Sequence, residues 1–210
     1  MSWNVHHRAI GVLFAVGLLL VACLPGRQLH GVPYSPARPA ADLPLADQFG
    51  RPFSLREQRG KVLAIYFGYT SCPDVCPLTL AQLTQVWREL TPEEADRFQP
   101  IFVTVDPERD TQDVLARYLS AFDNALASDR PRGFIGLRGT PEALASVLAA
   151  YGARAEKRPQ AGSAAGYTMD HTASVFVVDP HGTLVEWFPY GAAVDHIVAD
   201  VRYLLRKSAQ

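Results

Sequence analysis

Cysteine is scarce in this sequence. The 210 residues include only Cys23, Cys72 and Cys76, and Cys23 lies in an N-terminal apolar segment. A domain with two cysteines has no separate resolving cysteine, which disfavours a peroxide-reducing enzyme. It also has no third thiolate for zinc, which usually requires four ligands.

Net charge and long apolar runs are also lacking. The formal net charge is -1, so the composition indicates neither a nucleic-acid interface nor a strongly acidic partner. The uncharged run at residues 9–24 has 16 residues, whereas a membrane-spanning helix usually needs roughly 20. The hydrophobic content of 48% is enough for a proper core, and without internal repeats we expect one globular domain.

The N-terminus has the layout of an export signal, because Arg8 precedes the apolar run. The run ends in LVAC, which resembles the lipobox of bacterial lipoproteins, where the cysteine is lipidated after cleavage; here that cysteine is Cys23. A lipid anchor, an uncleaved signal anchor and an incidental cysteine all remain open. Each alternative places the rest of the chain in the periplasm or another extracytoplasmic space, which is oxidising for thiols.

The composition divides the chain into three parts. We expect a signal or anchor segment at residues 1–23, a tether rich in proline and alanine at 24–44, and a folded domain at 45–210. The tether has no apolar period, which is typical of a semi-extended linker. An ordered arm packed on the domain is the alternative.

Strand and helix patterns alternate along the domain. Short β-branched and aromatic runs predict buried strands, and apolar residues at helical spacing predict helices. The expected strands lie at 61–69, 99–106, 134–137, 173–179 and 183–188, and the expected helices at 77–90, 111–122, 140–152 and 194–205. This order predicts an α/β fold in which a mixed sheet has helices on both faces, that is, a three-layer sandwich.

The stretch GYTSCPDVCPLTL, residues 68–80, places Cys72 and Cys76 between a strand and the following helix. A helix N-terminus favours the thiolate form of a nearby cysteine. A spacing of four residues places two side chains on one helical face, so both sulfurs could bind one ion. The spacing favours a metal site without excluding a disulfide.

A third ligand should be a histidine. His171 differs from the other histidines because it directly precedes a predicted buried strand, at a sheet edge where functional loops gather. A lone histidine is more often structural, so this assignment depends on the two thiolates. The other five lie in the export segment, the tether, a turn or a helix: His6, His7, His30, His181 and His196.

Three motifs together resemble the Sco/SenC family: GYTSCPDVCPLTL, then VTVDPERDT, then YTMDHTASVFVVDPHG. The similarity covers about residues 43–205. Members of this family are membrane-tethered proteins with a thioredoxin-like fold that bind copper and assist assembly of the CuA site of cytochrome c oxidase. The resemblance therefore implies a thioredoxin-like three-layer α/β/α sandwich with a membrane-tethering N-terminus.

The resemblance also implies roles for particular residues. Cys72 and Cys76 would be the copper thiolates and His171 the imidazole ligand. Asp106 and Asp110 match an acidic motif of the family and would support the site or a partner; taken alone, they could instead cap the helix near residue 111. Residues 156–166, rich in alanine, glycine and serine, lie where a recognition loop would be.

The leading function is copper delivery to the CuA-bearing subunit of cytochrome c oxidase, with other copper chaperones as further partners and no nucleic acid. Soft thiolates select Cu(I) and an imidazole also suits Cu(II), so the ligand set could hold both. This makes the protein an assembly factor rather than an enzyme. The alternative is a thiol-disulfide oxidoreductase that uses Cys72 and Cys76 to keep partner cysteines reduced. A purely structural disulfide is disfavoured, because so short a loop gains little from closure.

Overall fold

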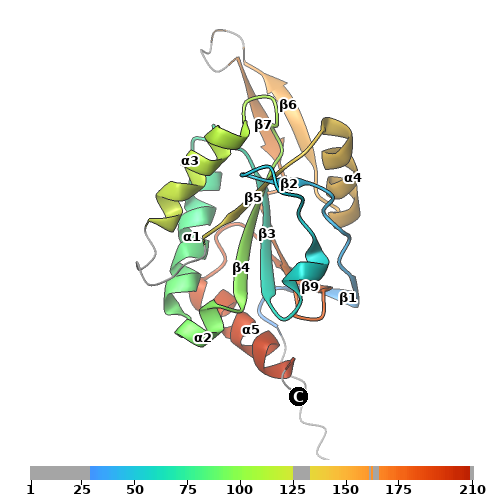
Figure 1. The fold of residues 1–210 in the computed structure, drawn as a ribbon, viewed down its shortest axis with the longest axis vertical. Helices are drawn as coiled ribbons and strands as arrows, with labels where there is room; N and C mark the ends of the chain where they lie inside the picture. The colour runs from blue at the N-terminus through green and yellow to red at the C-terminus, as the bar shows by residue number, and fades with distance from the viewer. Residues whose placement is uncertain (1–28, 125–132, 161, 163–165, 209–210) are drawn as a thin grey trace, which may run out of the picture.

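The computed structural model describes residues 29–124, 133–160, 162 and 166–208. A seven-stranded sheet of order β1-β9-β8-β3-β4-β5-β2 forms its centre, and β6 and β7 form a separate hairpin (Figure 1). In chain order the elements are β1 (Val32–Pro39), β2 (Ala46–Asp47), η1 (Leu55–Gln58), β3 (Val62–Gly68), α1 (Val75–Glu89), α2 (Pro92–Ala95), β4 (Phe98–Thr104), α3 (Gln112–Asp123), β5 (Ile135–Arg138), α4 (Pro141–Tyr151), β6 (Ala155–Pro159), β7 (Tyr167–His171), β8 (Val175–Val178), β9 (Thr183–Phe188) and α5 (Val194–Lys207). The fold is mixed α/β, as the sequence predicts.

The two central strands, β3 and β4, are parallel and in register from the pair Val62 and Phe98 to the pair Gly68 and Thr104. Every residue of both strands is buried. Strands that are covered on both faces read as continuous apolar runs rather than alternating ones. This explains why their continuous apolar runs predict both strands from the sequence. Because they are parallel, their carboxyl ends lie at the same edge of the sheet.

Helices cover both faces of the sheet. Successive side chains of a strand point to opposite faces, and Tyr66 and Phe67 of β3 show this. The Tyr66 hydroxyl contacts Cys76 of α1, whereas the Phe67 ring packs edge-to-face on Tyr151 at the end of α4. Helix α1 contacts both α3 and α5, and Figure 1 shows α1 and α3 on one side of the sheet, α5 at its lower end and α4 on the other side.

Part of the expected tether is ordered. Residues 32–39 form strand β1, which pairs antiparallel with β9 at the edge of the sheet. The prediction of a free linker was wrong for this stretch, and the alternative of an ordered arm holds there. Prolines are typical of linkers, but an edge strand also tolerates them, because it pairs on one side only and does not need every N–H donor.

The stretch before β1 is attached to the domain by two buried carboxyl groups. The Nδ1 atom of His30 lies 2.8 Å from an oxygen of Asp200 in α5, and the Gly31 amide donates to Glu186 in β9 at 3.1 Å. A side chain at Gly31 would collide with the Glu186 carboxyl group. His30, expected in a tether, therefore packs on the domain. The segment 9–24 and Cys23 lie outside the described residues, among which no helix is long and apolar enough to cross a membrane.

Residues 156–166 also differ from the expectation of a loop. Strand β6 pairs with β7 in register from Ala155 opposite His171 to Pro159 opposite Tyr167, so residues 156–159 belong to a β-hairpin, and residues 161 and 163–165 lie outside the described residues. Figure 1 shows the hairpin at one end of the molecule, beyond the main sheet. Strand β6 is largely exposed and β7 is half-buried, so neither strand shows the apolar alternation that would have revealed it.

Folding stability should fall with rising pH because of Glu186. Burial, together with the neighbouring Asp200, raises the pKa of Glu186 to about 8, so the folded protein keeps a proton that the unfolded chain loses near its ordinary pKa. The resulting stabilisation is complete below the unfolded pKa and is lost as the pH rises through 8. We expect wild type to lose on the order of 4 kcal/mol of unfolding free energy between pH 5 and pH 9 through this group.

Urea unfolding at both pH values measures this loss. The Glu186→Gln variant should lack that part of the pH dependence, and Glu57→Gln, which alters an exposed glutamate, should retain it. Equal pH dependence in wild type and Glu186→Gln would contradict the prediction.

Candidate metal centre

The two cysteines lie at the carboxyl end of β3. Strand β3 ends at Gly68, a short loop carries Cys72, and α1 begins at Val75, so that only Cys76 is helical. The expectation that one helical face aligns both sulfurs was therefore wrong, because Cys72 precedes the helix and the loop brings it back. Cys76 is wholly buried, while Cys72 is 9% exposed and so lies at the solvent-facing rim of the cluster. Both cysteines are free thiols.

The imidazole of His171 completes the cluster. His171 is the last residue of β7, and its Nε2 atom lies 3.4 Å from the sulfur of Cys76. Its Nδ1 atom lies 3.3 Å from the Thr172 carbonyl oxygen, so a proton on Nδ1 can be donated to that oxygen. In this tautomer Nε2 carries no proton, and its lone pair can bind a metal ion beside the sulfurs. The donor atoms of Cys72, Cys76 and His171 all lie within 4.8 Å of one another. The two cysteines and His171, which follows Cys76 by 95 positions, can therefore hold one metal ion.

Burial controls the charge of the cluster. It raises the pKa of the Cys76 thiol to about 12, so the expected thiolate at the helix N-terminus does not form in the metal-free protein. Desolvation of a sulfur without solvent contact raises the thiol pKa more than the helix dipole lowers it, because the dipole amounts to only a partial charge at the helix N-terminus. Burial also lowers the pKa of His171, which favours the neutral imidazole that binds metals.

An aromatic wall that the sequence analysis did not identify surrounds the cluster. The rings of Tyr66 and Tyr69 stand edge-on to His171, with centroids at 6.0 and 5.7 Å, and the Tyr66 hydroxyl donates to the Cys76 sulfur at 3.6 Å. Gly68 is equally constrained, because a Cβ there would lie 2.9 Å from that sulfur. One signal was available in the sequence. A tyrosine in an otherwise apolar buried strand needs a partner for its hydroxyl.

The acidic residues of the second motif lie beside the cluster but do not cap a helix. Thr111 itself caps α3, since its side chain accepts from the Val114 amide. Asp110 accepts from the Thr70 amide at 3.0 Å and from its hydroxyl at 2.6 Å. Asp106 accepts from the Tyr167 hydroxyl at 2.8 Å. The capping alternative was therefore wrong, and both carboxylates face the two segments that carry the candidate ligands.

The other histidines that the structure describes are not part of the cluster. His181 and His196 are exposed, and the His196 ring stacks on His30 at 4.5 Å between centroids. His6 and His7 lie outside the described residues. Among the described residues, the three residues of the cluster form the one group that could hold a metal.

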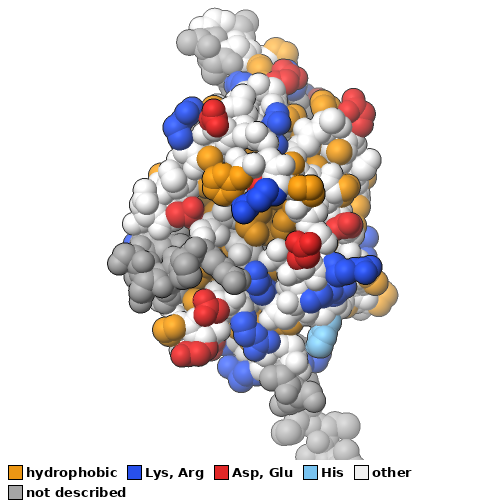
Figure 2. All heavy atoms as spheres, in the orientation of Figure 1, with side chains coloured by type: hydrophobic (Ala, Val, Ile, Leu, Met, Phe, Trp, Pro, Cys, Tyr) orange, Lys and Arg blue, Asp and Glu red, His pale blue; other side chains and the backbone are white. Residues whose placement is uncertain are grey.

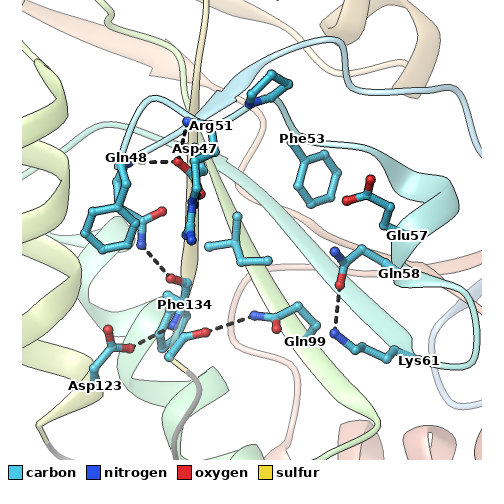
Figure 3. A pocket seen from close by; sticks show the side chains of 14 residues that line it. Asp47, Gln48, Arg51, Phe53, Glu57, Gln58, Lys61, Gln99, Asp123 and Phe134 are labelled. Atoms are coloured by element: carbon cyan, nitrogen blue, oxygen red, sulfur yellow. Dashed lines mark hydrogen bonds and ion pairs between the residues drawn. The ribbon is translucent and has the colours of Figure 1, made fainter.

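A pocket of about 690 Å³ lies elsewhere, near the edge strand β2. Figure 3 shows that its polar side chains bind one another, with Arg51 paired to Asp47 and Lys61 to Gln58. Figure 2 shows this face of the molecule, where acidic and basic side chains are interspersed around apolar ones. The pocket contains none of the predicted site residues.

Fold and site together define a class of protein: a thioredoxin-like domain in which two cysteines at the junction of β3 and α1 and a histidine at the end of β7 form a Cys₂His cluster that could hold a metal ion. The sequence model of the SCO1/SenC family matches residues 34–206, and the chain belongs to this family. It is 35% identical over 162 residues to the mitochondrial SCO2 homologue of Bos taurus, an alignment that covers 77% of this chain. The chain spans about 58% of the length of that relative.

Solved structures show the same fold. ScoI of Bradyrhizobium japonicum with copper bound is 37% identical, with a TM-score of 0.66 over 79% of this chain and 98% of that one. The apo Sco1 protein of Thermus thermophilus is 36% identical, with a TM-score of 0.71 over 86% of this chain and 99% of that one. The relatives thus include a copper-bound and a metal-free structure.

The two thiols should differ in reactivity. In the reduced, metal-free protein we expect iodoacetamide to modify Cys72 at least about tenfold faster than Cys76, because Cys76 is wholly buried and its raised pKa of about 12 leaves little thiolate near pH 8. Mass spectrometry of partly labelled protein measures both rates. Cys76 labelling should accelerate with rising pH. Equal rates at pH 8 would contradict the predicted asymmetry.

Proposed function

We propose that the protein is a copper chaperone that helps to metallate the CuA site of cytochrome c oxidase, and that Cys72, Cys76 and His171 are its copper ligands. The observation that carries the proposal is the convergence of two sulfurs and one imidazole nitrogen within 4.8 Å. Relatives with copper bound support it. Copper is the cargo of the protein, which acts as an assembly factor rather than an enzyme.

The donor set favours copper over zinc. Two thiolates suit Cu(I), and an added imidazole also accommodates Cu(II). Structural zinc sites are almost always four-coordinate. Among the described residues, no further histidine, cysteine or carboxylate joins the cluster as a fourth ligand. A site with three protein ligands also leaves a coordination position for an incoming ligand, as transfer requires.

The three ligands have different tasks in this proposal. Cys76 loses its thiol proton when copper binds, so affinity increases with pH. His171 provides a neutral imidazole whose orientation the Thr172 carbonyl fixes at 3.3 Å. Cys72 lies at the rim with 9% of its surface exposed. A donor atom of the recipient can therefore replace Cys72 first, and copper then passes by stepwise ligand exchange.

The location of the protein belongs to the same proposal. An anchor at residues 1–23, through a lipid on Cys23 or an uncleaved apolar segment, would hold the domain against the membrane in the periplasm or another extracytoplasmic space. The recipient would be the CuA-bearing subunit of the oxidase, and other copper chaperones would supply the metal. Of the proposed tether, residues 24–28 lie outside the described residues, whereas His30 and Gly31 already bind the domain and β1 begins at Val32.

Anaerobic titration of the reduced protein with Cu(II) tests the ligand set. Wild type should develop an intense thiolate-to-copper absorption band that saturates at about one equivalent. His171→Ala should shift or abolish the band, whereas His181→Ala, in an exposed turn, should leave it unchanged. Oxidation of the cysteines to a disulfide without this band would reject the copper site.

A thiol-disulfide oxidoreductase is the second candidate, since the two sulfurs lie close enough to react after a small movement. The buried Cys76 thiol disfavours it, because attacking cysteines usually have lowered pKa values. In cells, copper delivery requires all three ligands. We expect His171→Ala to reduce oxidase copper content and activity about as strongly as Cys72→Ser. Full oxidase activity with His171→Ala, but not with Cys72→Ser, would favour thiol exchange instead.

A further inference from the structure

The loop at residues 106–110 lies beside the cysteine loop because of the sheet topology. The cysteine loop follows β3 and the 106–110 loop follows β4, and these strands are parallel neighbours. The Val105 amide donates to the Gly68 carbonyl at 2.8 Å, so the two chain segments remain in contact where the strands end. Arg138 of β5 fixes the second loop from its other side by donating to the carbonyl oxygens of Pro107 and Asp110.

Asp110 binds the segment that leads to Cys72. Its carboxylate is wholly buried and accepts three hydrogen bonds, from the Thr70 amide and hydroxyl and from the Thr104 hydroxyl at 2.5 Å. Thr70 lies two residues before Cys72. A buried carboxylate with several donors is held in one orientation. Asp110 therefore fixes the backbone at the start of the cysteine loop.

Asp106 and Arg109 bind the hairpin that carries His171. Asp106 is 2% exposed, pairs with Arg109 and accepts from the Tyr167 hydroxyl. Arg109 donates to the Tyr167 carbonyl at 3.0 Å, and its guanidinium group lies 3.7 Å from the centroid of that ring. Tyr167 begins β7 and His171 ends it. The exposed ion pair of Lys157 in β6 with Glu108 adds a further contact.

We propose that Asp106 and Asp110 are positioning residues that hold the two halves of the copper site together, Asp110 through Thr70 on the cysteine side and Asp106 through Tyr167 on the histidine side. This inference rests on the proposed copper site. The hairpin is not part of the main sheet, and it joins the sheet where the chain continues from His171 to β8, the neighbour of β3. The 106–110 loop adds a side-chain link between the hairpin and the cysteine loop, and Tyr69 contacts both Arg109 and His171.

Two variants test the two halves separately in the purified full chain. Asp110→Asn should weaken Cu(I) and Cu(II) binding by about tenfold or more, since loss of a group that orients metal ligands commonly has this effect. Tyr167→Phe should weaken Cu(II) binding by several-fold and leave Cu(I) binding nearly unchanged, because the imidazole matters mainly for Cu(II). Competition with a Cu(I) chelator and titration with Cu(II) measure both affinities, and the thiolate-to-copper absorption band reports the geometry.

Matched controls separate positioning from folding. Asp113→Asn removes an exposed carboxylate in the first turn of α3, and Tyr190→Phe removes an exposed hydroxyl; both should bind copper as wild type does. Thermal unfolding of the metal-free variants shows any loss of stability, which alone would not change the ratio of Cu(I) to Cu(II) affinity or the position of the band. If Asp110→Asn does not fold, Thr70→Val removes one of its donors and carries the same expectation.

Unchanged affinities and spectra in Tyr167→Phe and in the folded Asp110→Asn or Thr70→Val variant would overturn this inference alone. A wild-type chain without the thiolate-to-copper absorption band would overturn the proposed function and this inference with it.

Discussion

The parallel pairing of β3 with β4 is the interaction on which the rest of the site depends. It brings the loop after each strand to the same edge of the sheet, with Gly68 opposite Thr104 at the end of the ladder. It also fixes which face each side chain occupies. A slip of one residue in β3 would turn Tyr66 away from α1 and Cys76. The complete burial of both strands makes such a slip costly, so the register that builds the core also builds the site.

The sequence revealed this framework because buried strands and amphipathic helices have strong periodic patterns. The helices at Val75–Glu89 and Val194–Lys207 appear within two residues of their expected bounds. Spacing and strand position already indicated Cys72, Cys76 and His171, and the resemblance to the Sco/SenC family then assigned all three to one copper site. Spacing on its own predicted that one helical face aligns the two sulfurs. In the structure, the loop before α1 brings Cys72 to Cys76 instead.

The elements that the sequence did not reveal share a physical cause. Strand β1 contains prolines and pairs at an edge, β6 is largely exposed and β7 is half-buried, so none of the three shows an apolar alternation. The hydrogen bonds of Asp106 and Asp110 depend on residues more than 35 positions away, such as Thr70 and Tyr167. Local sequence patterns carry no information about such partners. Only the three-dimensional arrangement distinguishes these carboxylates from helix caps.

The balance between burial and the helix N-terminus bears on the proposed copper transfer. A strongly depressed cysteine pKa would give a permanent thiolate, a tighter metal site and a reactive nucleophile. Burial of Cys76 has the opposite effect, so copper must displace a proton and part of its binding energy is lost to that displacement. His171 offsets part of the loss because it is already neutral at pH 7. In the proposed transfer, Cys72, which is less buried than Cys76, would be the ligand that a recipient reaches. Such a site would bind copper through three donors and release it through the most accessible one.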